Sequence, residues 1–221
     1  MKIIDLHSHT HYSADACSTP EDLIEKAIES GVETLGITDH NYWFEDRIYE
    51  YVRTISALKH QYKGHIELLC GMEIRTVPRS SDLDPALLGD FDFCIFENVG
   101  HPLQSFEDFL AYRRCFPCKA GIAHTDLFAY QAQCGQPVFE LMRENDLFWE
   151  LNVNYDSIHG YHEHSYVKEF MQSYEQQDAI RKAGIEVSVG FDCHNAAEYD
   201  VQRIREANVF LDRVQIPKPF C

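Results

Sequence analysis

The sequence predicts an α/β protein in which about seven strand–helix units wrap into a closed or nearly closed barrel. Short apolar runs alternate with helical patterns along the chain. No linker or low-complexity stretch divides the 221 residues, so we expect one domain, residues 1–221. Potential metal ligands follow most of the apolar runs, as in a barrel whose active site lies at the C-terminal strand ends. An open sheet would instead gather ligands at its switch point, from only a few strands.

The N-terminal half supplies the first of these units. The apolar pair Ile3-Ile4 predicts a buried strand. Thr19 is suited to cap the following helix, with Pro20 at its first position and Gly31 at its end. The other elements expected in this half are a strand over 34–38, a helix from about 45 to 61, and a strand over 66–72 that ends at Glu73.

The C-terminal half continues the alternation. Apolar runs predict strands over 91–96, 120–123, 148–152 and 185–191. Helical spacing of apolar residues predicts helices over 105–116, 137–145, 167–183 and 201–213. This order favours a parallel sheet with helices on its outside.

The charge balance limits the class of ligand. The chain carries 19 basic and 36 acidic residues, a net charge of -17, which disfavours long nucleic acid as a partner. A small phosphorylated substrate remains compatible, because bound divalent ions reverse the sign of the local field. The sequence leaves the oligomeric state open.

Composition also bears on compartment and redox state. No apolar run is long enough to cross a bilayer, and no basic stretch followed by an apolar segment marks the N-terminus, so we expect no membrane association and a cytoplasmic location. The eight cysteines are then expected to be reduced thiols. Cys115 and Cys118 have CxxC spacing, but no second pair follows at zinc-finger distance.

The segment after the first strand introduces the candidate site. Residues two apart share one face of a strand, so His7 and His9 can point at one ion, with Asp5 deeper on that face. One His-x-His pair is also common on an ordinary polar face. Other candidate ligands follow later apolar runs, however: Asp39 and His40, Glu73, His101, His124, and Asp192 with His194. A shared metal site explains this placement better than scattered histidines do.

These motifs resemble those of one protein family. His7-x-His9 with Asp15, Thr38-Asp39-His40-Asn41, Gly71-Met72-Glu73, Ala123-His124 and Gly190-Phe191-Asp192-Cys193-His194 occur in the order seen in the PHP (polymerase and histidinol phosphatase) family. The resemblance spans nearly the whole chain. It implies a distorted TIM-like (β/α)7 barrel that holds up to about three divalent ions.

The resemblance also implies which residues hold each ion. His7, His9, Glu73 and Asp192 would hold the first, and Glu73 would bridge to a second held by His101 and His124. The third ion would be held by Asp15, His40 and His194. His101 departs from the family pattern, because Glu97 to Gly100 separate it from its strand, and Ala14-Asp15-Ala16 replaces the usual Ser-Asp-Gly. Mixed nitrogen and oxygen ligands suit zinc, manganese or iron.

The implied activity is hydrolysis of a phosphate monoester, with histidinol phosphatase as the most specific form. A hydroxide shared by the ions would be the nucleophile, and Asp192 and His194 are assigned to catalysis as well as to metal binding. Arg75, two residues after Glu73, could bind the phosphate with its forked guanidinium, or could equally be a solvent-exposed loop residue. Asn152 could contact the substrate or merely tie down a loop.

Further residues near the site have weaker assignments. Arg79 is a second candidate for phosphate binding. Asp39 could orient a ligand, and Asp126 could do so or cap a turn. The histidine-rich segment from His159 to His164 is expected to be an exposed or substrate-facing loop.

Other functions stay open at this point. A nucleotide phosphatase, or a nuclease acting on short nucleic acid, would use the same ligands, and a protein-tyrosine phosphatase is a less favoured enzyme. A catalytically silent, metal-stabilised regulatory domain is the alternative that is not an enzyme.

Overall fold

Parallel strands form the centre of the protein. The computed structural model describes residues 2–42, 47–78, 88–156 and 162–221. The parallel strands in these ranges are β1 (Ile4–Asp5), β2 (Thr34–Ile37), β3 (Glu67–Cys70), β4 (Glu73–Arg75), β5 (Phe93–Glu97), β6 (Lys119–Ile122), β7 (Leu147–Asn152) and β10 (Val187–Gly190). They pair in two sheets of order β1-β2-β3 and β10-β7-β6-β5-β4. All pairs within these two sheets are parallel, as predicted.

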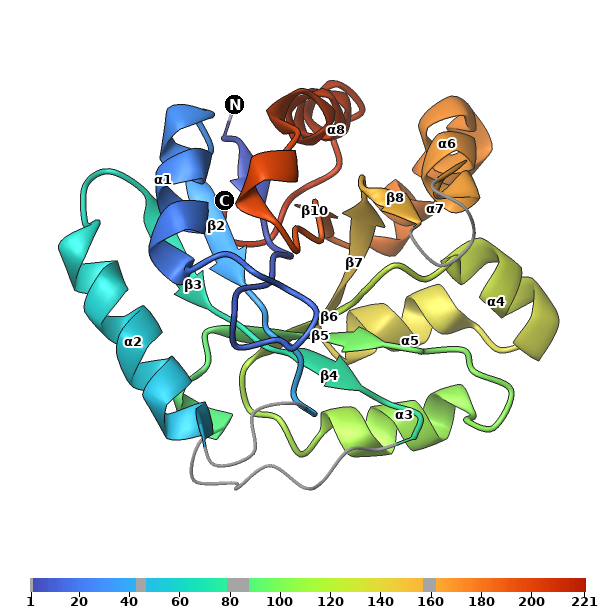
Figure 1. The fold of residues 1–221 in the computed structure, drawn as a ribbon. Coiled ribbons are helices and arrows are strands. Elements are labelled where there is room, and N and C mark those ends of the chain that lie inside the picture. Colours follow the sequence, from blue (N-terminus) through green and yellow to red (C-terminus); the bar gives the residue numbers. More distant parts are fainter. Residues whose placement is uncertain (1, 43–46, 79–87, 157–161) are drawn as a thin grey trace.

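A few backbone hydrogen bonds outside the ladders join the two sheets into a ring. On one side, the Leu6 amide donates to the Val189 carbonyl at 2.9 Å, which links β1 to β10. On the other, the Ile95 amide donates to the Met72 carbonyl at 3.0 Å, just beyond β3. The fold is therefore the distorted TIM-like α/β architecture that the sequence predicts, with two interruptions in its strand ladders (Figure 1).

The helices lie outside the strands (Figure 1). They are α1 (Pro20–Glu29), α2 (Ile48–Gln61), α3 (Phe106–Arg113), α4 (Leu127–Cys134), α5 (Val138–Glu144), α6 (Ser165–Gln172), α7 (Tyr174–Ala183) and α8 (Val201–Arg213). The expected start of α1 is confirmed: the Thr19 side chain accepts from the Asp22 amide, and the Asp22 carboxylate binds the Thr19 amide in return. Short accessory elements are the hairpin β8 (Tyr155–Asp156) and β9 (His162–Glu163), and the 3-10 turns η2 (Leu88–Asp90) and η3 (Ala196–Glu198).

Two apolar layers hold these elements in place. The ring interior is filled by a small set of buried side chains: Ile4, Leu6, Leu69, Phe93, Ile95, Ala123 and Phe148. Phe220, near the C-terminus, packs against this set, with its ring 5.6 Å from that of Phe93. A larger cluster fills the space between strands and helices and includes the fully buried Trp149. The filled interior leaves the polar strand ends as the place for chemistry.

Three elements differ from the sequence prediction. The single strand expected before Glu73 is two strands, because the chain leaves β3 at Gly71 and Met72 and pairs β4 with β5 instead. The helix expected over 167–183 is divided at Ser173, whose hydroxyl caps α7 by accepting from the Gln176 amide. Helix α4 was not predicted, although Asp126 caps it in the same way at the Ala129 amide.

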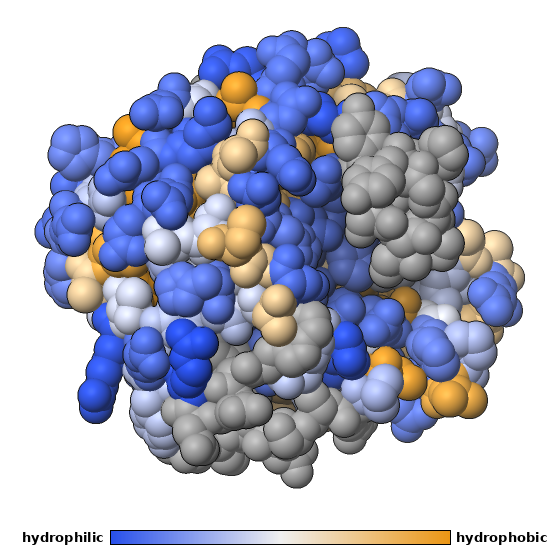
Figure 2. All heavy atoms as spheres, viewed as in Figure 1, coloured by the Kyte–Doolittle hydropathy of each residue, from blue (hydrophilic) through white to orange (hydrophobic). Residues whose placement is uncertain are grey.

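The surface agrees with the acidic composition. The face in Figure 2 is largely hydrophilic, with scattered apolar side chains. Among the described helices, none has the length and apolar character to span a bilayer.

Candidate metal centre

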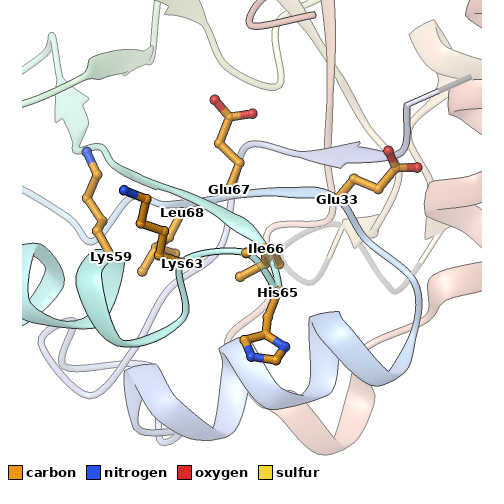
Figure 3. Close-up of a pocket in the computed structure, with 8 residues that line it drawn as sticks. Glu33, Lys59, Lys63, His65, Ile66, Glu67 and Leu68 are labelled. Atoms are coloured by element: carbon orange, nitrogen blue, oxygen red, sulfur yellow. The ribbon is translucent and has the colours of Figure 1, made fainter.

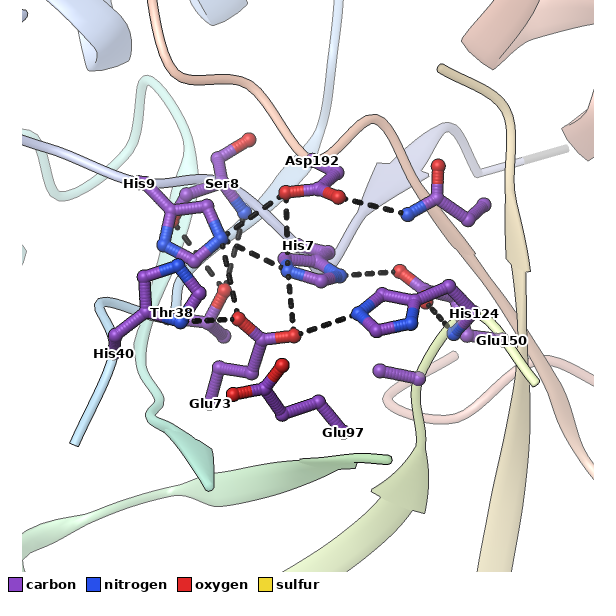
Figure 4. Close-up of polar contacts among 12 residues, drawn as sticks. His7, Ser8, His9, Thr38, His40, Glu73, Glu97, His124, Glu150 and Asp192 are labelled. Carbon is purple, nitrogen blue, oxygen red and sulfur yellow. Dashed lines mark hydrogen bonds and ion pairs between the residues drawn. The ribbon is translucent and has the colours of Figure 1, made fainter. Parts of the chain in front are cut away.

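Polar side chains from most of the strands meet at the C-terminal end of the ring. Figure 4 shows Glu73 at their centre, with His9 and His40 on one side and His124 on the other. We call the following residues the strand-end cluster: His7, His9, Asp15, His40, Glu73, Glu97, His124, Asp192 and His194. Three groups of potential ligands lie within this cluster, each with its donor atoms within 4.8 Å of one another.

The first group contains His7, His9 and Asp192. The Nε2 atoms of the two histidines are 3.0 Å apart, and Asp192 Oδ1 is 3.4 Å from the first and 3.1 Å from the second. The carboxylate of Glu73 lies 3.5 Å from both imidazoles. The structure thus brings together all four residues predicted for the first ion.

Hydrogen bonds at the far side of each imidazole orient these two histidines. His7 Nδ1 is 2.7 Å from Glu150 Oε1, an acceptor, so this nitrogen carries a proton and Nε2 is the nitrogen that can bind a metal. Gly190 makes room for this contact, because a Cβ atom there would collide with Glu150 and His7.

A relay of hydrogen bonds orients His9 in the same way. The Ser13 hydroxyl donates to Asp39 Oδ1 at 2.7 Å, which leaves its oxygen to accept from His9 Nδ1 at 3.3 Å. Asp39 also accepts from the amide and hydroxyl of Thr10, both at 2.8 Å. Through Ser13, Asp39 therefore orients His9, and not His40, the ligand next to it in the sequence.

The second group contains Glu73, Glu97 and His124. His124 Nε2 lies 3.0 Å from Glu73 Oε1. Glu97, the last residue of β5, occupies the place expected for His101. His101 is exposed, and its hydrogen bonds with described residues are confined to its own turn, including one from the Leu103 amide to Nδ1. The structure does not bring His101 into the strand-end cluster.

The third group contains His9, His40 and His194, and Asp15 lies beside the last two. Asp15 Oδ2 is 3.6 Å from His40 Nε2 and 3.4 Å from His194 Nε2. The other nitrogen of His40, Nδ1, is 2.7 Å from Glu73 Oε2. His9 lies against both histidines, with its ring centroid 4.3 Å from each of theirs. The set predicted for a third ion is thus assembled in the structure.

The charges of this cluster compensate one another in the metal-free protein. Burial lowers the pKa of His40, but Glu73 and Asp15 raise it to about 10. Burial likewise opposes protonation of His124, while Glu73 raises its pKa to about 9. Burial and the neighbouring His40 lower the pKa of His9 to about 3. The carboxyl pKa of Glu73 is well below its usual range, because His40 and His7 outweigh the effect of burial.

Two cluster residues adopt an unusual backbone conformation. His124 has φ of 23° and Asp192 has φ of 53°, a region that side chains other than glycine rarely occupy. The His124 amide donates to Glu150 Oε2 at 2.7 Å, and the Asp192 amide donates to the His7 carbonyl at 2.6 Å. These bonds hold the strained residues in place, as is common at functional sites.

The two predicted substrate-binding residues differ in exposure. Asn152 is 1% exposed and donates from Nδ2 to Asp192 Oδ2 at 3.1 Å, so its contact is with the cluster itself. Arg75 is partly exposed, pairs through Nε with Glu97 Oε1 at 3.0 Å, and lies 3.4 Å from the ring centroid of Tyr42.

The other sequence candidates lie elsewhere or outside the described ranges. Asp126 caps α4, as one interpretation expected. Arg79 and residues 159–161 of the histidine-rich segment fall outside the described residues. Glu150 and Ser13 had no assigned role toward a metal. The sequence signal for Glu150 was its place at the end of β7, two residues before Asn152.

The strand-end cluster fits divalent cations. Glu73 Oε2 is buried and accepts no hydrogen bond of good geometry from the described residues. The two facing Nε2 atoms of His7 and His9 would repel one another unless a cation or proton lay between or beside them. Imidazole and carboxylate together suit zinc, manganese or iron, so the residues present match the predicted ions.

A separate hollow opens at the opposite end of β3. It has a volume of about 510 Å³ and includes Lys59, Lys63 and Glu67 (Figure 3). Lys59 is paired with Asp92, and Glu67 with Lys2. Much of its charge is already neutralised, and no ligand cluster of described residues borders it, so the strand-end cluster is the better candidate site.

Comparison with known proteins identifies the class. The family model described as PHP domain matches residues 5–213. The chain belongs to the PHP family, as the order of its motifs predicted. This assignment covers nearly every element described above.

Four relatives that match this chain are three phosphatases and one nuclease. A probable phosphatase of Acetivibrio thermocellus is 26% identical, covering 97% of this chain and 88% of the relative. The histidinol-phosphatase of Lactococcus lactis is 31% identical over 80 residues, which is 34% of this chain. That match covers 30% of the Lactococcus lactis protein. A match to a probable histidinol-phosphatase of Deinococcus radiodurans covers 39% of that relative. A 39-residue stretch, 18% of this chain and 13% of the relative, is 59% identical to a 5′-3′ exoribonuclease of Escherichia coli.

Solved structures support the fold. The structure of histidinol phosphate phosphatase from Lactococcus lactis, complexed with zinc, L-histidinol and phosphate, has a TM-score of 0.65 at 17% identity and covers 98% of this chain and 95% of that one. A histidinol phosphatase structure from Listeria monocytogenes has a TM-score of 0.56 at 13% identity and covers 88% of this chain and 96% of that one. At these identities the likeness concerns the fold.

Proposed function

We propose that the protein is a metal-dependent phosphatase that hydrolyses small phosphate monoesters. The observation that carries this proposal is the position of Glu73, whose two carboxylate oxygens reach histidines from three other strand ends. The family membership, the probable phosphatase aligned over most of both chains and the two histidinol-phosphatase relatives support it.

The cluster residues would hold up to three ions, as the sequence predicted, with Glu97 in the place assigned to His101. Bound zinc, manganese or iron would stabilise charge on the phosphate oxygens and acidify a shared water at neutral pH. Glu150 and Ser13 keep the ligating nitrogens of His7 and His9 free. Asn152 fixes the orientation of Asp192.

Arg75 would bind the substrate phosphate. Its Nε is paired with Glu97, while its Nη atoms have no hydrogen bond among the described residues. The Tyr42 ring restricts the guanidinium to one plane, which reduces the conformational entropy lost on phosphate binding. His194, with a side chain 33% exposed, is the cluster imidazole that a substrate reaches most readily.

The test is phosphate release from a panel of small monoesters by protein loaded with zinc, manganese or iron. We expect turnover with at least one ester and its loss in Asp192→Asn, which keeps the shape of the side chain. The matched control is Asp178→Asn, which removes a partly exposed ion pair with Lys182 on α7. Absence of turnover on every ester, with ions shown to be bound by elemental analysis, would contradict the proposal.

A nucleotide phosphatase or short-substrate nuclease is the second candidate. The stretch shared with the exoribonuclease favours it. Its 59% identity over 39 residues is higher than the identity of the three phosphatase relatives over their longer matches. Release of mononucleotides from a labelled oligomer, at a rate above that of monoester hydrolysis, would favour this candidate over the first.

A further inference from the structure

A second cavity borders the loops that carry two cluster residues. Its volume is about 260 Å³, and we call it the α3–α4 cavity; its wall includes Gly100, His101, Gln104, Phe106, Tyr130 and Gln136. Gly100 follows Glu97 by three residues, so their Cα atoms lie within about 11 Å of each other. The opposite wall is formed by α4, which begins three residues after His124. The cavity therefore lies among the segments that follow β5 and β6, the strands that lead to Glu97 and His124.

Polar groups in this wall lack partners. Gln104 is only 9% exposed, and its Oε1 accepts no hydrogen bond from any described residue. Gln136 Oε1 is also buried without a partner in the same part of the chain. Buried polar groups are nearly always hydrogen-bonded, so two such atoms at one cavity indicate a partner beyond the described residues, such as water or a ligand.

The cavity is held open by its backbone. Gly100 has φ of 88°, and a Cβ atom there would lie 2.9 Å from the Tyr130 ring. That ring also packs on Phe106, at a centroid distance of 5.9 Å. The wall is thus a fixed surface of one aromatic pair and two amides, and ligand binding costs little reorganisation.

The lining determines the chemistry of a matching ligand. Two amide oxygens accept hydrogen bonds, and the described wall contains no lysine, arginine, aspartate or glutamate. A carboxylate would find no cation there, and the net charge of -17 would repel it. Groups with N–H donors, neutral or cationic, match the acceptors.

We propose that the α3–α4 cavity receives the organic part of the phosphorylated substrate and selects groups that carry N–H donors. This inference rests on the proposed phosphatase function. Gln104 and Gln136 are then specificity-determining residues, and His101 belongs to the rim of the cavity. Water fills the same hydrogen-bonding role in the free protein and is displaced by the substrate.

The test compares esters that differ in one nitrogen group. The two pairs are phosphoethanolamine with propyl phosphate, and adenosine 5′-monophosphate with purine riboside 5′-monophosphate. Binding is measured by calorimetry after chelation of divalent ions, which prevents turnover, and kcat/KM is measured separately with ions present. We expect tighter binding of the amino member of at least one pair, and the pair that responds identifies the source of the nitrogen.

Variants separate recognition from folding. Gln104→Leu should weaken binding of the preferred amino ester about five- to tenfold, the effect of one lost hydrogen bond, and leave its partner unchanged. Gln104→Glu keeps an acceptor oxygen and should retain the preference. Gln172→Leu, at an exposed site on α6, is the control.

The outcomes distinguish this inference from the proposed function. Equal binding within both pairs, or a preference that survives in Gln104→Leu, would overturn the cavity assignment even if esters are hydrolysed. A preference that depends on Gln104 without hydrolysis of any ester would retain the cavity as a binding site and refute the phosphatase proposal.

Discussion

To bind a metal, each imidazole in the strand-end cluster needs a proton on one nitrogen and a lone pair on the other. The fold meets this need at His7 with a carboxylate and at His9 with a serine. The His-x-His spacing was visible in the sequence because strand periodicity is local. The partners were not, because Glu150 comes from a strand more than a hundred positions away.

The exchange of His101 for Glu97 has a similar cause. The sequence favoured a histidine, and the strand was expected to end at Phe96. In the structure β5 continues to Glu97, which pairs in register with Arg75, and the chain then turns at Asn98, where φ is 61°. One additional strand residue therefore decides which side chain faces the cluster, and strand ends are the least certain feature of a sequence prediction.

Glu150→Gln should weaken metal binding about 10- to 100-fold, as the loss of an outer hydrogen-bond partner typically does. The amide cannot accept from both His7 Nδ1 and the His124 amide. Competition with a chromophoric chelator measures the affinity. Glu140→Gln, exposed on α5, should bind metal as the parent does. Equal affinities in all three proteins would rule out this role for Glu150.

Metal binding should release protons. In the metal-free protein the pKa of His40 is raised to about 10 and that of His124 to about 9, so both are protonated at neutral pH. A metal needs the neutral imidazole, and metal affinity should therefore increase as pH rises toward these values. Calorimetry in buffers of different ionisation enthalpy reports the protons released. Heats that do not depend on the buffer would contradict this expectation.

At the scale of elements, the sequence predicted those whose signals are local. The cap of α1 and the extent of α8 (Val201–Arg213) agree with the predicted ranges. The break between α6 and α7 could not be predicted, because a polar residue such as Ser173 also occurs on the exposed face of an uninterrupted helix. The division between β3 and β4 depends on which strand each residue pairs with, and that is a property of the assembled sheet.

Thr19→Ala tests whether the N-terminal cap of α1 contributes to the stability of the protein. Loss of the bond to the Asp22 amide should lower the free energy of unfolding by about 1 kcal/mol. Urea denaturation measures the change, and Thr19→Ser should restore most of it because serine is an equivalent cap. Phosphate release at a temperature where the protein is folded should not change. A stability unchanged by alanine would show that the helix relies on packing.

At the scale of the whole molecule, the predicted barrel is confirmed, but its two seams could not be predicted. A barrel of short strands was inferred from the repeated pattern and the family resemblance. Where the ladders are interrupted depends on the twist of the full ring and on contacts such as that between Leu6 and Val189. The strand-end cluster spans one of these seams, since His7 and Asp192 come from its two sides.

Metal ions should therefore stabilise the entire ring. An ion present at 100 times its dissociation constant contributes about 2.7 kcal/mol, which corresponds to a Tm increase of roughly 5–10 °C for a chain of this size. Calorimetric scans with and without a chelator measure this shift. A variant with both His7→Ala and His9→Ala should fold and show a smaller shift. An identical shift in that variant would place the stabilising ions elsewhere.

The seam between β1 and β10 has a consequence for biosynthesis. Asp5 accepts a hydrogen bond from the Phe191 amide, 186 positions further along the chain. A ribosome completes β1 long before its second neighbour, β10, which follows about 180 residues later. Until then β1 has one unpaired edge, and His7 and His9 lack Asp192. The first metal group can assemble only after β10 has been synthesised, so metal uptake at this group would report that the β1–β10 seam has formed.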